Sequence, residues 1–307
     1  MKITVVGGGV VGARAAQLLH DVDITVDVIE SVDNVTASDV AILAYGGDQS
    51  LGAAELMDRG IGVVSTSDDL RIVEKLLALH RESIAAGVPL VVGATAAPGL
   101  SGLLARHLAS GFDSADEIHV ATHGTGGPSC ARLHHKSLGG TALGLQDGEW
   151  IKRPAGSGRE LCWFPEPIGA RDCYRADLAD PVLLHMVFPD IQRISERRSA
   201  TRRDRLTARL PMLAPPHAEG GVGGVRVEVR GIKDGVRVVE ILGVAEKLGT
   251  IAGVVAAAFA AALGQGRLGQ EGLVIAGAAG LPTATLLRAI MEAGIKVSAF
   301  TGSDSYP

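Results

Sequence analysis

Three closely spaced glycines near the amino terminus, Gly7, Gly9 and Gly12, follow the short apolar run Ile3 to Val6. The residues after them, Ala13 to Leu19, are good helix formers, so the segment predicts a strand, a tight turn and a helix. In such a unit the first glycine permits a sharp turn, the second lets a diphosphate approach the backbone, and the third lets the helix pack on the strand. The helix also directs its free N–H groups and the positive end of its dipole at the phosphates. The spacing therefore predicts a dinucleotide site with contacts from Gly7, Gly9, Val10, Val11 and Gly12.

Glu30 stands at the end of the next β-branched run, Ile24 to Ile29. A carboxylate roughly 20 residues beyond the glycines, at the end of a second strand, can accept hydrogen bonds from the ribose hydroxyls of the adenosine. The same carboxylate would repel a 2′-phosphate, and no Arg or Lys follows it immediately. We therefore expect NAD as the cofactor in preference to NADP.

A third apolar run, Val40 to Ala44, leads into Tyr45 and the glycine pair Gly46-Gly47. Ligands of parallel α/β sheets bind at the carboxyl ends of the strands, where small residues let the backbone approach the ligand. We expect Ala44, Tyr45 and Gly46 to contact the cofactor. An ordinary tight turn is the alternative interpretation.

Proton donors for hydride chemistry are sought further along the chain, since a nicotinamide supplies the redox step and the protein handles the proton. The densest cluster is His134-His135-Lys136, and Tyr174 is a further candidate. We assign the catalytic role to His135, Lys136 and Tyr174. The alternatives are a solvated cluster and a core tyrosine. We expect no metal site, because adjacent histidines point apart on a strand and no carboxylate lies at ligand spacing.

Arginines could grip a substrate carboxylate through the planar fork of the guanidinium group. The candidates are Arg132, Arg171 and Arg175, with surface ion pairs as the alternative interpretation. Arg132 and Arg171 are the preferred substrate contacts, together with Thr95 in the cleft. A separate basic run between Arg197 and Arg209 is interrupted by acidic residues and lacks aromatic residues, so a solvated helix face is favoured over nucleic-acid binding.

The elements that position these residues follow from hydrophobic periodicity. Strand and helix patterns alternate from the amino terminus to Val92, which predicts a parallel sheet with helices on both faces. After Ile118 the pattern changes, and a hairpin is predicted around Asp234-Gly235, where Val and charged residues alternate. The expected fold class is α/β: a Rossmann-type doubly wound sheet in residues 1–117, and a second α+β domain with a mostly antiparallel sheet in residues 118–307. The last helix could pack back on the first domain.

Composition narrows the class of protein. Hydrophobic residues make up 47% of the chain, which is enough for a large core, and the net charge of −5 argues against a nucleic-acid partner. The three cysteines have no metal-like spacing, and an odd number without a secretory leader is typical of a reduced, cytoplasmic protein. The apolar stretch Ile251 to Leu263 is too short to span a bilayer. We expect a small-molecule substrate, no membrane partner, and a homodimer.

The stretch from Gly93 to His107, with Pro98-Gly99 at its centre, resembles the saccharopine dehydrogenase-like family (saccharopine reductase, carboxynorspermidine dehydrogenase and lysine 6-dehydrogenase). Members have a strand, a Gly-x-x-Pro-Gly-type turn and a helix at this point, after a dinucleotide-binding fold. The resemblance covers about the first 110 residues and the remainder in outline. It implies an NAD(P)-dependent oxidoreductase acting on a small amino acid, amine, imine or carbonyl compound, with Pro98 facing the cofactor cleft. Ala97 stands where members of known activity often have an acidic residue, so their amino-acid substrate is not carried over.

Three other functions fit the glycine turn. FAD enzymes begin in the same way, but this chain lacks a later Gly-Asp segment of the kind that closes over the ribityl chain. A non-catalytic NAD-binding protein would explain the missing acidic residue before Pro98. Use of S-adenosylmethionine ranks lowest, because nothing downstream indicates methyl transfer.

Overall fold

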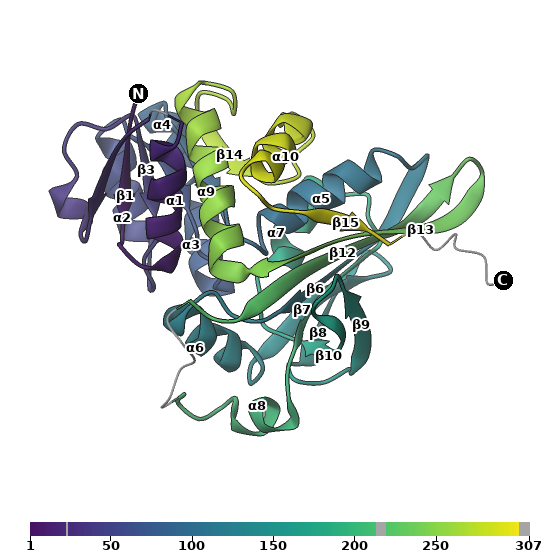
Figure 1. The fold of residues 1–307 in the computed structure, drawn as a ribbon. Helices are drawn as coiled ribbons and strands as arrows, with labels where there is room; N and C mark the ends of the chain where they lie inside the picture. The colour runs from purple at the N-terminus through teal and green to yellow at the C-terminus, as the bar shows by residue number, and fades with distance from the viewer. Residues whose placement is uncertain (23, 213–218, 301–307) are drawn as a thin grey trace.

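Six parallel strands form the sheet that carries the amino-terminal glycine turn (Figure 1). The computed structural model describes residues 1–22, 24–212 and 219–300. The sheet has the order β14-β5-β4-β3-β1-β2. Its strands are β1 (Lys2–Val6), β2 (Thr25–Ile29), β3 (Val40–Leu43), β4 (Gly62–Ser65), β5 (Pro89–Val92) and β14 (Gly272–Ile275). All residues of β3, β4 and β5 are buried, as expected for parallel strands that are covered on both faces.

Helices cover both faces of this sheet. Helix α1 (Val10–His20) and helix α9 (Leu248–Gly264) lie side by side and share one core with Ile3 and Val5 of β1 (Figure 1). On the other face, α2 (Ser50–Asp58) and α3 (Leu70–Ala78) pack over Val6, while α4 (His80–Ala86) contacts β5 and β14. The predicted doubly wound arrangement is confirmed.

The crevice that binds ligands in such sheets lies beside β1. The chain passes from β1 to β2 on one side and then crosses to β3 on the other, so β1 lies between them. The connections that follow β1 and β3 run to opposite sides of the sheet, and this change of direction opens a crevice at the carboxyl ends of the two strands. Only the short helix η1 (Val32–Asn34) joins β2 to β3, so this part of the fold is trimmed.

A second, mixed sheet has the order β15-β13-β12-β6-β11-β10-β9, and β7 pairs with both β11 and β8. Among its described strand pairs, β6 with β11 is parallel and the others are antiparallel, which confirms the predicted fold class. The strands are β6 (Ser114–His123), β7 (Thr141–Gln146), β8 (Glu149–Pro154), β9 (Glu160–Phe164), β10 (Gly169–Arg175), β11 (Arg193–Ser199), β12 (Val222–Lys233), β13 (Val236–Lys247) and β15 (Val297–Ala299). The remaining helices are α5 (Leu100–Ala109), α6 (Pro128–Ser137), α7 (Asp180–Val187), α8 (Arg202–Thr207) and α10 (Thr283–Glu292).

Two local expectations were wrong. The segment His134–Lys136 lies on helix α6, where Pro128 occupies the first turn, and not on a strand. The basic run is not one helix face, because Arg197 and Arg198 belong to strand β11 and Arg198 is buried. In the second case, pairing of β11 with β10 and β6 outweighed the local pattern.

The chain returns to the first sheet near its end. Strand β14 pairs with β5, and helix α9 packs on α1 (Figure 1). The boundary expected between residues 117 and 118 is therefore crossed again late in the chain, and the division into two domains stays a prediction. No helix in the described ranges has the length and apolar character needed to cross a membrane.

Candidate functional site

A cleft of about 580 Å³ opens at the carboxyl ends of β1 and β3. Its walls come from four segments: the glycine turn before α1, the turn after β3, the loop from Thr66 to Asp69, and the segment from Gly126 to Leu133 at the start of α6. Segments after strands of the first sheet and the segment at the start of α6 therefore line one cleft beside β1.

The glycine turn has the geometry that a diphosphate requires. Gly7 has a φ of +106°, and a Cβ there would lie 2.8 Å from the carbonyl oxygen of Ala44. A Cβ on Gly12 would overlap the carbonyl oxygen of Gly7, so this residue permits the helix to pack on the strand. A Cβ on Gly9, in contrast, would meet no atom within 4 Å, and no side chain caps the first turn of α1. Gly8, Gly9, Val10 and Val11 line the cleft, so the start of this helix borders open space, which fits a bound diphosphate.

Glu30 lies at the rim of the same cleft. Its side chain is exposed, and a Cβ on Gly8 would lie 2.9 Å from Oε1 of Glu30, so the carboxylate lies next to the turn. Arg132 is the cationic residue among the lining residues that the structure describes. The carboxylate is therefore placed to accept hydrogen bonds from a sugar that extends from the diphosphate.

The other cofactor candidates divide into two groups. Val10, Val11, Ala44, Tyr45 and Gly46 line the cleft together with Gly7 and Gly9. Gly12 and Pro98 do not line it. Pro98 is buried and packs against Gly93: a Cβ on Gly93 would lie 2.6 Å from Cγ of Pro98.

A smaller inner cavity of about 70 Å³ adjoins the cleft. Val11, Thr66, Asp68, Gly126 and Cys130 line both spaces, so the two hollows share a wall. Thr95, which we expected at the substrate, lines the inner cavity. Ala96, Ala97, Thr122, His134, Leu178, Glu196, Leu248 and Ala252 complete its lining. A cavity of this size holds only a small group, so the reacting end of a ligand could enter it but a whole large ligand could not.

A Cys–His–Asp cluster lies where the cleft meets the inner cavity. Sγ of Cys130 lies 3.3 Å from Nδ1 and 3.6 Å from Nε2 of His134, and Nε2 lies 2.9 Å from Oδ2 of Asp68. Cys130 and His134 are four residues apart on α6, so they share one face of the helix. Burial and Arg198 lower the pKa of His134, but Cys130 and Asp68 outweigh them and raise it to about 9.

The buried carboxyl group of Glu196 also lines the inner cavity. Glu196 is 2% exposed, its Oε2 accepts a hydrogen bond from the Asp180 amide at 3.1 Å, and its Oε1 has no partner among the described residues. Burial and the neighbouring Asp180 raise the pKa of Glu196 well above its usual range. Burial also raises the pKa of Asp180 to about 7, although Ser101 donates a hydrogen bond to it at 2.9 Å. The hydroxyl of Thr122, on the same cavity, also lacks a partner within the described chain.

The predicted catalytic residues lie outside these two hollows. His135 contacts the hydroxyl of Thr207 at 2.9 Å, and Lys136 is exposed on a neighbouring hollow. The ring of Tyr174 is buried beneath the guanidinium group of Arg205, 4.1 Å from the ring centre. Of the predicted substrate arginines, Arg132 lines the cleft, whereas Arg171 lies on a separate hollow.

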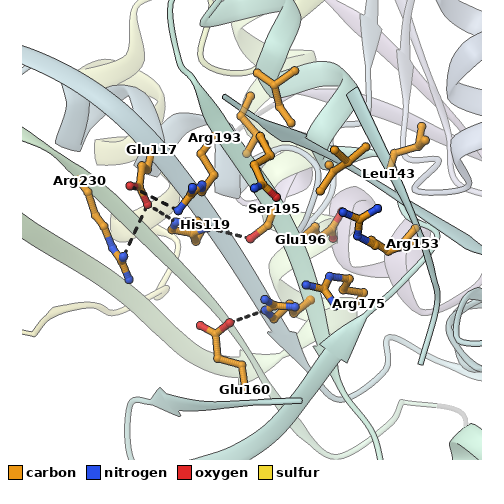
Figure 2. Close-up of a pocket in the computed structure, with 17 residues that line it drawn as sticks. Glu117, His119, Leu143, Arg153, Glu160, Arg175, Arg193, Ser195, Glu196 and Arg230 are labelled. Carbon is orange, nitrogen blue, oxygen red and sulfur yellow. Dashed lines mark hydrogen bonds and ion pairs between the residues drawn. The ribbon is translucent and has the colours of Figure 1, made fainter. Parts of the chain in front are cut away.

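Arg175 lines a different pocket of about 320 Å³ (Figure 2). This pocket lies on the face of the second sheet opposite to the one that carries Arg198. Side chains alternate between the two faces of a strand, so Ser195 and Arg197 face this pocket from β11 while Arg198 lies on the other face. Glu160 pairs with Arg197 at 2.6 Å, and His119 contacts Ser195 at 2.8 Å (Figure 2). This pocket shares Glu196 with the inner cavity but shares no lining residue with the cleft at the glycine turn.

Asp68, Cys130, Thr122 and Glu196 were not predicted as site residues from the sequence. His134 was a candidate proton donor but was not among the assigned catalytic residues. The spacing of Cys130 and His134 is a signal that could have been used once the segment was predicted as a helix. Asp68 and Glu196 have no local signal, because they reach the cavity only through the pairing of distant strands.

No family model matches the sequence, and no curated protein is significantly similar to it. The fold, however, is similar to solved structures. Apo saccharopine dehydrogenase (L-Glu forming) from Saccharomyces cerevisiae aligns with 98% of this chain and 100% of its own, at 13% identity and a TM-score of 0.66. The engineered D-amino acid dehydrogenase bound to NADP+ aligns with 93% of this chain and 95% of its own (15% identity, TM-score 0.52). The C. glutamicum DAP dehydrogenase in complex with DAP aligns with 95% and 98% (15% identity, TM-score 0.52). The structure thus has the saccharopine dehydrogenase-like fold that the resemblance around Pro98-Gly99 predicted.

Proposed function

We propose that this protein is a nicotinamide-dependent oxidoreductase that prefers NAD and acts on a small carbonyl, imine, amine or amino-acid substrate. The observation that carries the proposal is the position of Glu30 and the open backbone of Gly9 on one cleft, which adjoins a cavity lined by titratable groups. The likeness to dehydrogenase structures supports the same class.

In this proposal the glycine turn binds the diphosphate and Glu30 accepts hydrogen bonds from the adenosine ribose. When bound, the nicotinamide ring supplies or accepts the hydride. The residues of the protein must exclude water, orient the substrate and hold a proton near the reacting atom. The shared wall of the two hollows, at Thr66 and Cys130, is the place where cofactor and substrate could meet.

Glu196 is the group proposed to hold the proton. Glu196 lines the inner cavity, and its Oε1 has no partner among the described residues. Burial and the neighbouring Asp180 raise the pKa of its carboxyl group well above the usual range, which favours the protonated form. A protonated carboxyl group can donate to a carbonyl oxygen or an imine nitrogen as the hydride arrives. Thr95 and Thr122 line the same cavity and could orient that oxygen or nitrogen. Arg132 remains a candidate for a substrate carboxylate at the outer end.

The test is a direct assay of hydride transfer. The protein is incubated with NADH that carries deuterium at C4 and with a panel of small aldehydes, ketones and imines, and the products are analysed by mass spectrometry. Deuterium on the former carbonyl or imine carbon supports the proposal. NADH binding without labelled product from any member of the panel would favour a non-catalytic NAD-binding protein.

A further inference from the structure

The pocket on the second sheet that Ser195 and Arg197 face carries an excess of positive charge (Figure 2). Five arginines and three glutamates are among the residues that line it. We propose that this pocket binds a small organic dianion, a dicarboxylate or a phosphate monoester, between Arg153 and Arg175. The proposal does not rest on the nicotinamide site or on the proposed function.

Around Glu117 the charges of this pocket are paired. Nε2 of His119 lies 3.0 Å from Oε2 of Glu117. The guanidinium groups of Arg193 and Arg230 lie 3.8 and 3.5 Å from the same carboxylate (Figure 2). Arg230 also contacts the carboxylate of Glu228. These two arginines are therefore offset by carboxylates of the protein itself.

Two further guanidinium groups meet at Gly158. A Cβ on Gly158 would overlap the guanidinium group of Arg175, and Nη1 of Arg197 donates a hydrogen bond to the Gly158 carbonyl at 3.1 Å. The turn that contains Gly158 is tied to strand β10, because the amide of Arg175 donates to the Ser157 carbonyl at 3.0 Å. The fold therefore holds Arg175 and Arg197 close together beside one residue.

The positive charge at this place exceeds the negative charge. Nε of Arg197 lies 2.6 Å from Oε2 of Glu160, so Arg197 is offset (Figure 2). Arg175 is half-buried, and Nη1 of Arg153 donates to the Lys152 carbonyl at 3.2 Å; neither arginine forms an ion pair with a residue that the structure describes. Burial and the two neighbouring arginines lower the pKa of Arg175, although Glu160 opposes them. A bound anion would relieve this unfavourable arrangement.

The charge and size of the pocket indicate the class of ligand. Its third carboxyl group, Glu196, is buried, and its raised pKa favours the protonated form, so it adds little negative charge. Two unpaired guanidinium groups match the two negative charges of a dianion, and each can donate two parallel hydrogen bonds to a carboxylate or phosphate. A volume of about 320 Å³ lies at the lower end of small-molecule sites, which range over roughly 300–1,000 Å³. Leu143 and Ile151 also line the pocket and offer apolar surface to the carbon atoms of such a ligand.

The test measures the binding of succinate and of glycerol phosphate to the full chain by calorimetry. Sodium chloride keeps the ionic strength constant, so that general screening does not change during the titration. We expect one saturable site per chain for at least one of the two probes, and a higher Tm when it is bound. Binding of succinate alone identifies a dicarboxylate site, and binding of glycerol phosphate alone a phosphate site. In Arg175→Met the affinity should fall at least about tenfold.

Arg171→Met is the matched control, because it removes the same charge from the same strand, but Arg171 lines a separate hollow. Its affinity for the probe should equal that of the parent. The proposal is overturned if neither probe binds saturably to the folded parent, if Arg175→Met binds as tightly as the parent, or if both variants lose affinity equally. If Arg175→Met does not fold, Arg153→Met decides: unchanged affinity in that variant refutes the site. NADH binding, measured separately, reports on the proposed function and does not depend on these outcomes.

Discussion

Nε2 of His134 lies 2.9 Å from Oδ2 of Asp68, although 66 residues separate them in the chain. The contact joins α6, which follows the second sheet's first strand, to the loop after β4 of the first sheet. It marks the point at which the two halves of the site meet. The predictions below test the cofactor cleft, the inner cavity and the packing that supports them.

The preference for NAD can be tested at Glu30. In Glu30→Arg the guanidinium group would attract the 2′-phosphate that the carboxylate repels, so NADPH should bind more tightly than in the parent and NADH less tightly. We expect the ratio of the two dissociation constants to shift at least about tenfold, which corresponds to about 1.4 kcal/mol. Fluorescence titrations with both cofactors measure this ratio, and equal ratios in the two proteins would remove Glu30 from the site.

Loss of the proton donor can be tested with Glu196→Gln. The amide keeps the shape of the side chain but cannot release a proton, so kcat should fall by about 100-fold or more while NADH affinity stays constant. The pH–rate profile should also lose one ionisation, which a merely structural role would not explain. Glu160→Gln, on the opposite face of the second sheet, is the control and should retain kcat. An unchanged pH profile in Glu196→Gln would assign the proton to another group.

The buried carboxyl groups predict a pH-dependent stability. The pKa of Asp180 is raised from 3.8 to about 7, so between these values the unfolded chain has released a proton that the folded protein retains. The contribution of Asp180 to the free energy of unfolding is therefore fully present below about pH 4. It falls as the pH rises towards 7, by at most about 1.4 kcal/mol per pH unit.

Urea unfolding of the parent and of Asp180→Asn at several pH values in that window measures the effect. The slope of unfolding free energy against pH should be shallower in the variant. A variant with the parent's slope would show that Asp180 does not carry the dependence.

Close packing of α1 on α9 predicts a cost for Gly253→Ala. A Cβ on Gly253 would lie 2.7 Å from Cβ of Arg14 and 2.9 Å from the carbonyl oxygen of Val11. Alanine gains about 1 kcal/mol of helix propensity over glycine, but the overlap should outweigh this gain and cause a net loss of 1–3 kcal/mol, with α1 pushed from its place. Urea unfolding gives the value. The reverse change Ala261→Gly, half-buried on the same helix, should cost only about 1 kcal/mol. A neutral or stabilising Gly253→Ala would show that the helices can separate freely.

The sequence predicted that the glycine turn and Glu30 would lie together, and both line one cleft, because their signals are local. Gly7, Gly9 and Gly12 fall within six residues; a Cβ would clash with the backbone at Gly7 and Gly12, whereas at Gly9 it would meet no atom within 4 Å. The position of Glu30 beside the glycine turn could be predicted because only one helix and one strand separate the two. The parallel sheet was predictable for the same reason, since its strands are apolar runs between helices, with the exception of β14, which comes late in the chain.

The inner cavity could not be predicted in this way. Its polar groups come from β4, α5, α6, β6 and β11 or the loops beside them, and only tertiary pairing brings them together. The segment expected as a strand at His134–His135 is a helix, which places His134 one turn from Cys130, and the fold supplies Asp68. His135, the residue we favoured, points to Thr207 instead.

The account depends most on the claim that a dinucleotide binds across the glycine turn, and Gly9→Ala tests it most directly. The new Cβ would meet no atom of the protein within 4 Å, so the variant should be as stable as the parent, yet it would occupy the space of the diphosphate. NADH titration followed by fluorescence should show saturable binding to the parent and at least about tenfold weaker binding to Gly9→Ala. Equal NADH affinity in the two proteins, or no binding to the folded parent, would contradict the claim.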